Sequence, residues 1–296
     1  MSAASTRHRP RRMVWADAFT TQRFAGNPCA VVFDAADVPV ETRLAFTRET
    51  RLSECSFIVG SDKADFGARY YLASREILLA GHPTIATCAV LEHAGLLAGR
   101  ERITLELGIG VIEVAIDRSG PAPVCTMVQP APTFGASYAP GDIAALVGLT
   151  ADDVRGTPQT VSTGTPFCVT QLTGHEALAR ARLDIDAMRV LQPQVDFFEP
   201  FLFVTPGFTA AGDTAARLFL VPPEPAEDPF TGSATGAMAA YGVARGILPA
   251  RFTAEQGHAI GRPGQASVDV VGAADAIQAV RVGGSGVVLM DGDVFL

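Results

Sequence analysis

The sequence has a single lysine among its 296 residues, Lys63, and it lies in the polar turn GSDKADFG (60–67). Enzymes that use pyridoxal phosphate need a lysine in a buried active site, because its amine forms a Schiff base with the cofactor. A lysine in a polar turn does not meet that need. The sequence therefore argues against pyridoxal phosphate as a cofactor.

Cysteine and histidine lack the spacings of metal sites. The five cysteines are an odd number with no C-x-x-C pair, and the five histidines show neither H-x-x-x-H nor H-E-x-x-H. The stretch GIGVIE (108–113) also lacks the third glycine of the dinucleotide-binding fingerprint. We therefore expect reduced thiols in a cytoplasmic protein, no metal site and no cofactor.

The chain also lacks an apolar run near the length that crosses a bilayer, and it lacks the apolar stretch of a signal peptide. The first 13 residues carry four arginines, which predicts a disordered basic tail. The formal net charge of the whole chain is −8, so the body of the protein would repel nucleic-acid phosphates. We therefore expect a soluble protein that binds neither membranes nor nucleic acid.

What the sequence does contain is an internal repeat. The segment GHPTIATCAVLEHAGLL (81–97) matches GSATGAMAAYGVARGIL (232–248), with Gly, Thr, Ala, Ala, Gly and Leu recurring in step. The repeat continues in RITLELG (102–108) and RFTAEQG (251–257), with a two-residue offset in the alignment. A repeat this long indicates a duplicated domain and not a short-unit solenoid.

Each repeat predicts a helix that is apolar on every face, at roughly 84–98 and 235–248. Such a helix must be buried all round. Short alternating or β-branched segments on both sides of it predict strands that wrap it. A proline-rich passage near residue 120 interrupts both patterns. We therefore divide the chain into domains at 13–120 and 121–296, with the option that the last strand returns to the first domain.

The two predicted helices begin at glycine-bearing loops, AGHPT (80–84) and DPFTGSAT (228–235). The first turn of a helix offers unpaired N–H groups and a partial positive charge, which together bind anions. If the two halves face each other, both helix starts point into one cleft that suits a small carboxylate. Each loop taken alone favours an ordinary helix N-cap, and the recurrence of the two loops as a pair is what favours an anion site.

These residues resemble the PhzF-like proteins, the phenazine-biosynthesis isomerase family. The resemblance extends from about Val14 to the C-terminus, and the motifs that carry it are DAFTTQRFAGNPCAVV, RLSECSF, AGHPT, EDPFTGSA and EQGHAIGRPG, in that order. It implies an α+β fold of the diaminopimelate epimerase type, with two pseudo-symmetric domains that are each a β-barrel around a central hydrophobic helix. It also implies a homodimer.

The resemblance further implies a cofactor-independent isomerase that moves a proton between carbons of a small carboxylate-bearing substrate. Glu54 corresponds to the family's general acid/base, and His82 and Asp228 correspond to residues that orient and polarise the substrate. The positions that correspond to substrate contacts are Gly81, Pro83, Thr84, Thr231, Gly232, Ser233 and Ala234.

Other interpretations of these residues stay open. From its surroundings alone, Glu54 is also compatible with a surface carboxylate paired with Arg51, and Asp228 with an N-cap of the helix that follows. His258 and Arg262 lie in a glycine-rich stretch that closes one side of the cleft or simply makes a hairpin, so neither is placed in the catalytic set.

Two other functions also stay open. One is an amino-acid racemase or epimerase that uses Glu54 with a second acid across the cleft. Ala80 and Thr231 stand next to the positions at which epimerases of this fold carry cysteines, which argues against a racemase with two thiols. The other is a non-catalytic protein that binds a small anion on the same fold.

Overall fold

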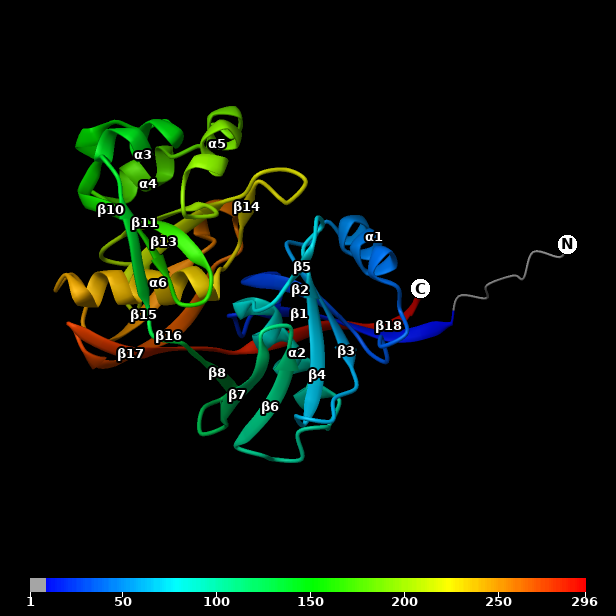
Figure 1. The fold of residues 1–296 in the computed structure, drawn as a ribbon. Coiled ribbons are helices and arrows are strands. Elements are labelled where there is room, and N and C mark those ends of the chain that lie inside the picture. The colour runs from blue at the N-terminus through cyan, green and yellow to red at the C-terminus, as the bar shows by residue number, and fades with distance from the viewer. Residues whose placement is uncertain (1–8) are drawn as a thin grey trace, which may run out of the picture.

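The computed structural model describes residues 9–296, which form two lobes that are each built around one long helix (Figure 1). The predicted basic tail falls partly on residues 1–8, which lie outside the described part. From Pro10 onward the chain is a strand that pairs with the last strand of the protein. The tail prediction was therefore wrong for residues 10–13, because the distant end of the chain supplies them with hydrogen-bond partners.

The first lobe contains a central helix, α2, which packs against β1, β2, β8 and β18. In chain order its elements are β1 (Pro10–Ala18), β2 (Asn27–Val32), α1 (Val40–Thr50), β3 (Cys55–Val59), β4 (Phe66–Tyr71), β5 (Glu76–Ile77), α2 (Gly81–His93), β6 (Arg102–Leu107), β7 (Gly110–Asp117) and β8 (Val124–Gln129).

The second lobe is built in the same way around α6, which packs against β10, β11, β16 and β17. Its elements, together with the returning last strand, are β9 (Thr133–Ser137), α3 (Pro140–Leu146), η1 (Ala151–Asp153), β10 (Val154–Ser162), β11 (Pro166–Leu172), α4 (His175–Arg180), α5 (Ile185–Leu191), η2 (Gln192–Gln194), β12 (Pro200–Val204), β13 (Thr214–Phe219), β14 (Glu227–Asp228), α6 (Gly232–Ala244), β15 (Arg251–Gln256), η3 (His258–Ile260), β16 (Gly264–Ala273), β17 (Ala276–Gly284) and β18 (Gly286–Phe295).

The two lobes repeat one scheme of strand pairing. In the first lobe β1–β2 is antiparallel, β2–β3 parallel, β3–β4 antiparallel and β4–β6 parallel, with the short β5 beside β4. In the second lobe β10–β11, β11–β12, β12–β13 and β13–β15 repeat these four relations, with the short β14 beside β13. The repeat in the sequence is therefore also a repeat in the structure.

The two lobes exchange strands. After β8, which pairs with β7 in the first lobe, the chain continues as β9, which pairs with β10 of the second lobe. After β17, which pairs with β16 in the second lobe, the chain continues as β18, which pairs with β1 of the first lobe (Figure 1). β8 and β17 also pair with each other. Because these strands join the lobes in one continuous sheet, a domain boundary at residue 120 stays a prediction.

The two central helices are buried on nearly every side, as their composition predicts, but each begins and ends earlier than expected. They start at Gly81 and Gly232, so these glycines belong to the first helical turn. They end before Gly95 and Gly246, whose φ angles of 71° and 67° are left-handed. Glycine adopts this conformation at little cost and terminates the helix.

The lobes differ in what covers them. The second lobe carries the additional helices α3, α4 and α5, which enclose a separate apolar core with residues such as Ile143, Leu178 and Met188. The first lobe has only α1 on the corresponding side, above a smaller cluster around Phe57 and Tyr71. No helix among residues 9–296 has the length and apolar character needed to cross a membrane.

Candidate active site

Glu54 lies where a helix has just ended and a strand begins. Arg51 adopts a left-handed conformation, φ 58°, that ends α1, and the chain then passes through buried Ser53 into β3. The Glu54 side chain is 16% exposed. The basic group within 4 Å of it among the described residues is His82. No ion pair joins Glu54 to the exposed Arg51 among residues 9–296, so the interpretation of Glu54 as a surface partner of Arg51 does not hold.

His82 is the second residue of α2 and is 3% exposed. Its Nδ1 lies 3.4 Å from Oε2 of Glu54 and 2.9 Å from Nδ2 of Asn27. Burial lowers the pKa of His82 to about 3, so the ring is neutral at neutral pH and its contact with Glu54 is not an ion pair. Its Nε2 is buried without a hydrogen-bond partner in residues 9–296. A neutral imidazole held in this way can form a hydrogen bond with a ligand.

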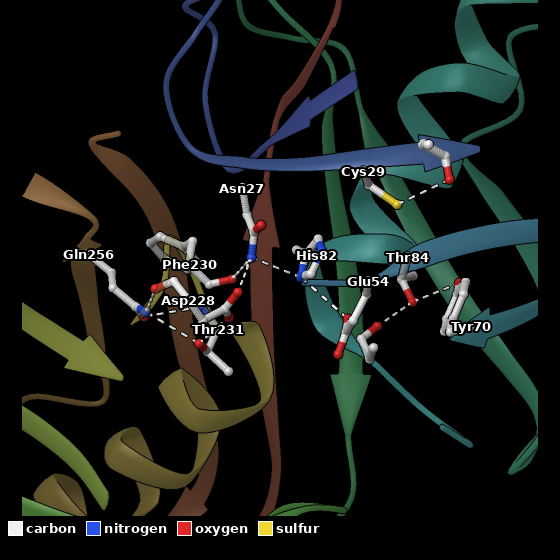
Figure 2. A network of polar contacts seen from close by, with 12 residues as sticks. Asn27, Cys29, Glu54, Tyr70, His82, Thr84, Asp228, Phe230, Thr231 and Gln256 are labelled. Atoms are coloured by element: carbon white, nitrogen blue, oxygen red, sulfur yellow. Dashed lines mark hydrogen bonds and ion pairs between the residues drawn. The ribbon is translucent and has the colours of Figure 1, made fainter. Parts of the chain in front are cut away.

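Asn27 connects the two lobes at the site. This fully buried residue is the first of β2, and Figure 2 shows its side chain between His82 and Asp228. Its Nδ2 donates to Oδ1 of Asp228 at 2.9 Å and to the carbonyl oxygen of Phe230 at 2.8 Å. We assigned Asn27 no role from the sequence. The available signal is its position between Gly26 and Pro28, where an ordinary strand residue would be apolar.

Asp228 comes from the second lobe, at the end of β14. Its Oδ2 accepts a hydrogen bond from Oγ1 of Thr231 at 2.5 Å, and its backbone oxygen accepts one from Nε2 of Gln256 at 2.8 Å. Thr231, not Asp228, is the N-cap residue of α6, and it makes no side-chain cap bond. The alternative interpretation of Asp228 as the helix cap was therefore wrong. The carboxylate instead connects the loop before α6 to Asn27 of the other lobe.

The two helix starts meet at their glycines. A Cβ placed on Gly81 would lie 2.8 Å from Cα of Gly232, and one on Gly232 would lie 3.2 Å from Cα of Gly81. Neither position has room for a side chain. From the sequence we expected these glycines to let a ligand approach the backbone. The structure adds a stronger reason, since they let the two helices approach each other.

A cavity of about 340 Å³ lies above this junction, and both lobes line it. Seven of the ten residues predicted for the site lie on its wall, and these are Glu54, Gly81, His82, Asp228, Thr231, Gly232 and Ser233. Pro83, Thr84 and Ala234 lie further along the helices and do not line the cavity. The hydroxyl of Thr84 is engaged inside the protein by Tyr70 and by the backbone of Ala80 (Figure 2).

The electrostatic environment favours the protonated form of the carboxyl groups in this cavity. Burial raises the pKa of Glu54 well above its usual 4.5, the negative charges of Asp228 and Glu199 raise it further, and Arg75 opposes them. Burial also raises the pKa of Asp228, against hydrogen bonds from Thr231, Ser53 and Asn27. A carboxyl group shifted in this direction is suited to giving and taking protons near neutral pH.

His258 and Arg262 are placed outside this network. The guanidinium of Arg262 donates to Asp17 at 2.6 Å and to the backbone of Gly26 at 2.9 Å. Arg262 therefore fixes the loop that leads into Asn27, which is a structural role. Among residues 9–296 no three His, Cys, Asp or Glu side chains are grouped as a metal ion would require.

Comparisons with known proteins agree with the fold and identify the family. The family model described as phenazine biosynthesis-like protein matches residues 16–292. The trans-2,3-dihydro-3-hydroxyanthranilate isomerase of Pseudomonas aeruginosa is 31% identical over 293 residues, which are 96% of this chain and 99% of that protein.

Solved structures show the same likeness. A predicted epimerase from Pseudomonas aeruginosa is 31% identical, with a TM-score of 0.81 and coverage of 97% of this chain and 99% of that one. A PhzF-family protein from Bacillus anthracis has a TM-score of 0.88 at 23% identity, covers 97% of this chain and 100% of that one, and so supports the fold alone. With its two helix-centred lobes and the family match over nearly its whole length, the chain belongs to the PhzF-like family of isomerases.

Proposed function

We propose that the protein is a cofactor-independent isomerase that moves a proton between carbons of a small carboxylate-bearing metabolite. The observation that carries this proposal is the network of Glu54, His82, Asn27 and Asp228, in which Glu54, His82 and Asp228 line a cavity between two helix N-termini. The cavity volume of about 340 Å³ is at the small end of the range for ligand pockets, which fits a substrate with one ring or a short chain.

In this proposal Glu54 carries the proton. Its ionised form takes a proton from a carbon next to the substrate's carboxylate, and the electron pair stays on the substrate. The first-turn N–H groups at Gly81, Gly232 and Ser233 hold the carboxylate and the charge that develops on it. His82 and Asp228 orient the substrate. These groups supply a base, an acid and an anion site by themselves, so the proposed step needs no metal or organic cofactor.

Deuterium incorporation tests this proposal. The protein is incubated in D2O with trans-2,3-dihydro-3-hydroxyanthranilate, the compound named for the relative, and separately with the common L-α-amino acids. We expect one of these carboxylates to gain deuterium at carbon, as followed by proton NMR. A ligand that binds in a thermal-shift assay but gains no deuterium would indicate the non-catalytic anion binder.

Racemisation or epimerisation of an α-amino acid is the second candidate. It is favoured by another carboxyl group in the cavity, that of Glu199, since inversion of a carbon centre needs proton donors on two faces. The two candidates differ in their product. The isomerase moves a double bond, whereas the epimerase only inverts a centre, so chiral chromatography of the labelled product separates them.

We also propose that the protein is a cytoplasmic homodimer. All five cysteines are buried free thiols, which supports a reducing compartment. The dimer rests on the family resemblance. Light scattering during gel filtration measures it directly, since the chain has a mass of 31.0 kDa and a dimer would have twice that mass.

A further inference from the structure

The strand pairing of the two lobes identifies a counterpart of Glu54. Cys55, the first residue of β3, pairs with Ala30 of β2. Pro200, the first residue of β12, pairs with Cys168 of β11 in the same parallel arrangement. The residue directly before β3 is Glu54, and the residue directly before β12 is Glu199. The duplication therefore places a glutamate at the same position of each lobe.

The segments around these glutamates correspond as well. Gly26, Asn27 and Pro28 at the start of β2 correspond to Gly164, Thr165 and Pro166 at the start of β11. Both glycines have positive φ angles, 59° and 126°. The correspondence thus includes the residue types at the strand start and the sign of the glycine φ angle, and does not rest on counting alone.

Both glutamates line the same cavity, Glu54 from the first lobe and Glu199 from the second. The guanidinium carbon of Arg75 lies 5.2 Å from the centre of the ring of Phe198, the residue directly before Glu199. Arg75 also lines the cavity and belongs to the first lobe. The two carboxyl groups therefore project from different lobes into one space, with a single arginine acting on both.

We propose that Glu199 is a second proton carrier, opposite Glu54, and that one reaction cycle uses both. This inference rests on the proposed function. The ionised Glu54 takes a proton from a substrate carbon, and the broken C–H bond leaves its electron pair on the substrate. Glu199, in its acid form, then gives its own proton to carbon from the other wall. Exchange with water restores both carboxyl groups, so no oxidant or other co-reactant is needed.

The charges in the cavity couple the two carboxyl groups. Burial raises the pKa of Glu199 to about 7, Arg75 acts against this shift, and Glu224 and Asp228 act with it. The charge of Glu199 in turn raises the pKa of Glu54. Two neighbouring carboxyl groups that disfavour each other's ionisation share one proton over a range of pH, which leaves one as base and the other as acid.

The consequence for the reaction is stereochemical. If Glu54 alone moved the proton, the proton would leave and return on one face of the substrate. With a second carrier on the opposite wall, the proton leaves on one face and a different proton arrives on the other. The product then carries a solvent-derived proton, and a carbon that both groups address is inverted.

The activity test compares Glu54→Gln, Glu199→Gln and Glu224→Gln in D2O, with the substrate found among the probes named above. We expect Glu199→Gln to lower product formation about 100- to 10,000-fold while deuterium still enters the recovered substrate, because Glu54 can still remove and return a proton. Glu54→Gln should abolish exchange and product formation together. Glu224→Gln removes a charge close to Glu199 from outside the cavity wall and should keep product formation within a few-fold.

Three results of this test contradict the inference. Product formation at the wild-type rate in Glu199→Gln would show that one carrier is enough. Equal losses of exchange and product formation in Glu199→Gln would show a structural role, and a raised KM with unchanged kcat would show recognition of a cationic substrate group. Wild-type exchange that survives Glu54→Gln would count against the proposed function itself.

A titration tests the inference without any substrate. In protein labelled with ¹³C at the glutamate side-chain carboxyls, the signals missing from Glu199→Gln and from Glu54→Gln identify the two residues. We expect the Glu199 signal to titrate near neutral pH and the Glu54 signal to move to lower pH in Glu199→Gln, whereas Glu113→Gln, an exposed control on β7, leaves both signals unchanged. If Glu199 titrates like an ordinary glutamate and the Glu54 signal does not respond to Glu199→Gln, the two groups share no proton and the inference fails, even if none of the probes is turned over.

Discussion

The two lobes place different side chains on one backbone plan. Ile77 and Asp228 hold the same position in β5 and β14, and His82 and Ser233 hold the same position at the helix starts. The first lobe therefore supplies an imidazole, and the second lobe supplies the carboxylate that the imidazole reaches through Asn27. Both walls of the cavity carry a glutamate at the matching position before β3 and β12, Glu54 and Glu199.

This comparison separates the parts of the site that serve the fold from the parts that serve chemistry. An ion pair recurs in both lobes, Arg69 with Glu76 at 3.8 Å and Arg217 with Glu227 at 2.6 Å. It joins two paired strands in each lobe, β4 with β5 and β13 with β14, so its recurrence follows from the duplicated fold. The pairs of positions that have diverged, such as Ile77 and Asp228, make the two walls of the cavity chemically different.

The largest loss of activity is expected for Glu54→Gln, which leaves Glu199 as the remaining glutamate of the matching pair. The amide keeps the shape of the side chain but cannot accept a proton, so deuterium exchange should fall about 100- to 10,000-fold, some 2.7 to 5.4 kcal/mol of barrier. Because the change removes a charge from a largely buried site, the melting temperature should hold or rise. Exchange at the wild-type rate, with His82→Ala or Asp228→Asn inactive, would mean that the proton carrier was misassigned.

The next effect concerns the contact between the two helix starts. Gly81→Ala forces a methyl group against Gly232, and Gly232→Ala forces one against the ring of Phe19 and against Gly81. Each should lower the free energy of unfolding by about 1–3 kcal/mol, as overpacking does. Each should also reduce exchange by up to about 100-fold, because the two walls move apart. Gly60→Ala meets no neighbour within 4 Å and serves as the control. Exchange at the wild-type rate in both variants would show that the close approach of the helix starts does not position the substrate.

Asp228→Asn tests the divergent pair of Ile77 and Asp228. It removes the charge at this position of the second lobe, where the matching position of the first lobe carries the uncharged Ile77. The negative charge of Asp228 raises the pKa of Glu54, so its removal should lower that pKa. The acidic limb of the exchange rate should then move to lower pH. The exposed Asp117→Asn is the matched control and should leave the profile in place. If the acidic limb of the exchange rate does not move, a group other than Asp228 determines its position on the pH scale.

The smallest effect is on the pH dependence of folding stability, which has opposite signs for His82 on the first wall and Glu199 on the second. The folded pKa of His82, about 3, lies below its usual 6.5, so its contribution to stability is complete above pH 6.5 and is lost as the pH falls toward 3. The folded pKa of Glu199, about 7, lies above its usual 4.5, so its contribution is complete below pH 4.5 and is lost as the pH rises toward 7.

Urea unfolding of the wild type, His82→Gln and Glu199→Gln between pH 4 and pH 8 measures these slopes. His82→Gln should lose less stability than the wild type as the medium is acidified. Glu199→Gln should gain stability relative to the wild type as the medium becomes neutral. Identical slopes in all three proteins would show that neither group is desolvated as the structure indicates.

Much of this arrangement could be predicted from local sequence, because it depends on local patterns. Apolar residues on every face predicted the two central helices, and the recurrence of Gly81 and Gly232 predicted that their starts form a pair. The roles of Asn27 and Glu199 could not be predicted in this way. Each lies beside a strand of ordinary composition, and its importance comes from residues far along the chain, such as Asp228. The same limit applies to the strand exchange, since pairing between distant strands leaves no local pattern, and the return of the last strand to the first domain was stated from the sequence only as an option.

That exchange of strands has a consequence for how such a protein can arise. β9 pairs with β10 in the way that β18 pairs with β1, and each follows the strand that joins the two lobes. A single half that ended in such a strand could not close its own barrel, but two copies could close each other's by swapping their last strands. The present chain has the topology of such a swapped dimer fused end to end, with its cavity lined by both halves. In a symmetric dimer the two walls of such a cavity would be identical, whereas in a fused chain matching positions such as Ile77 and Asp228 can carry different side chains.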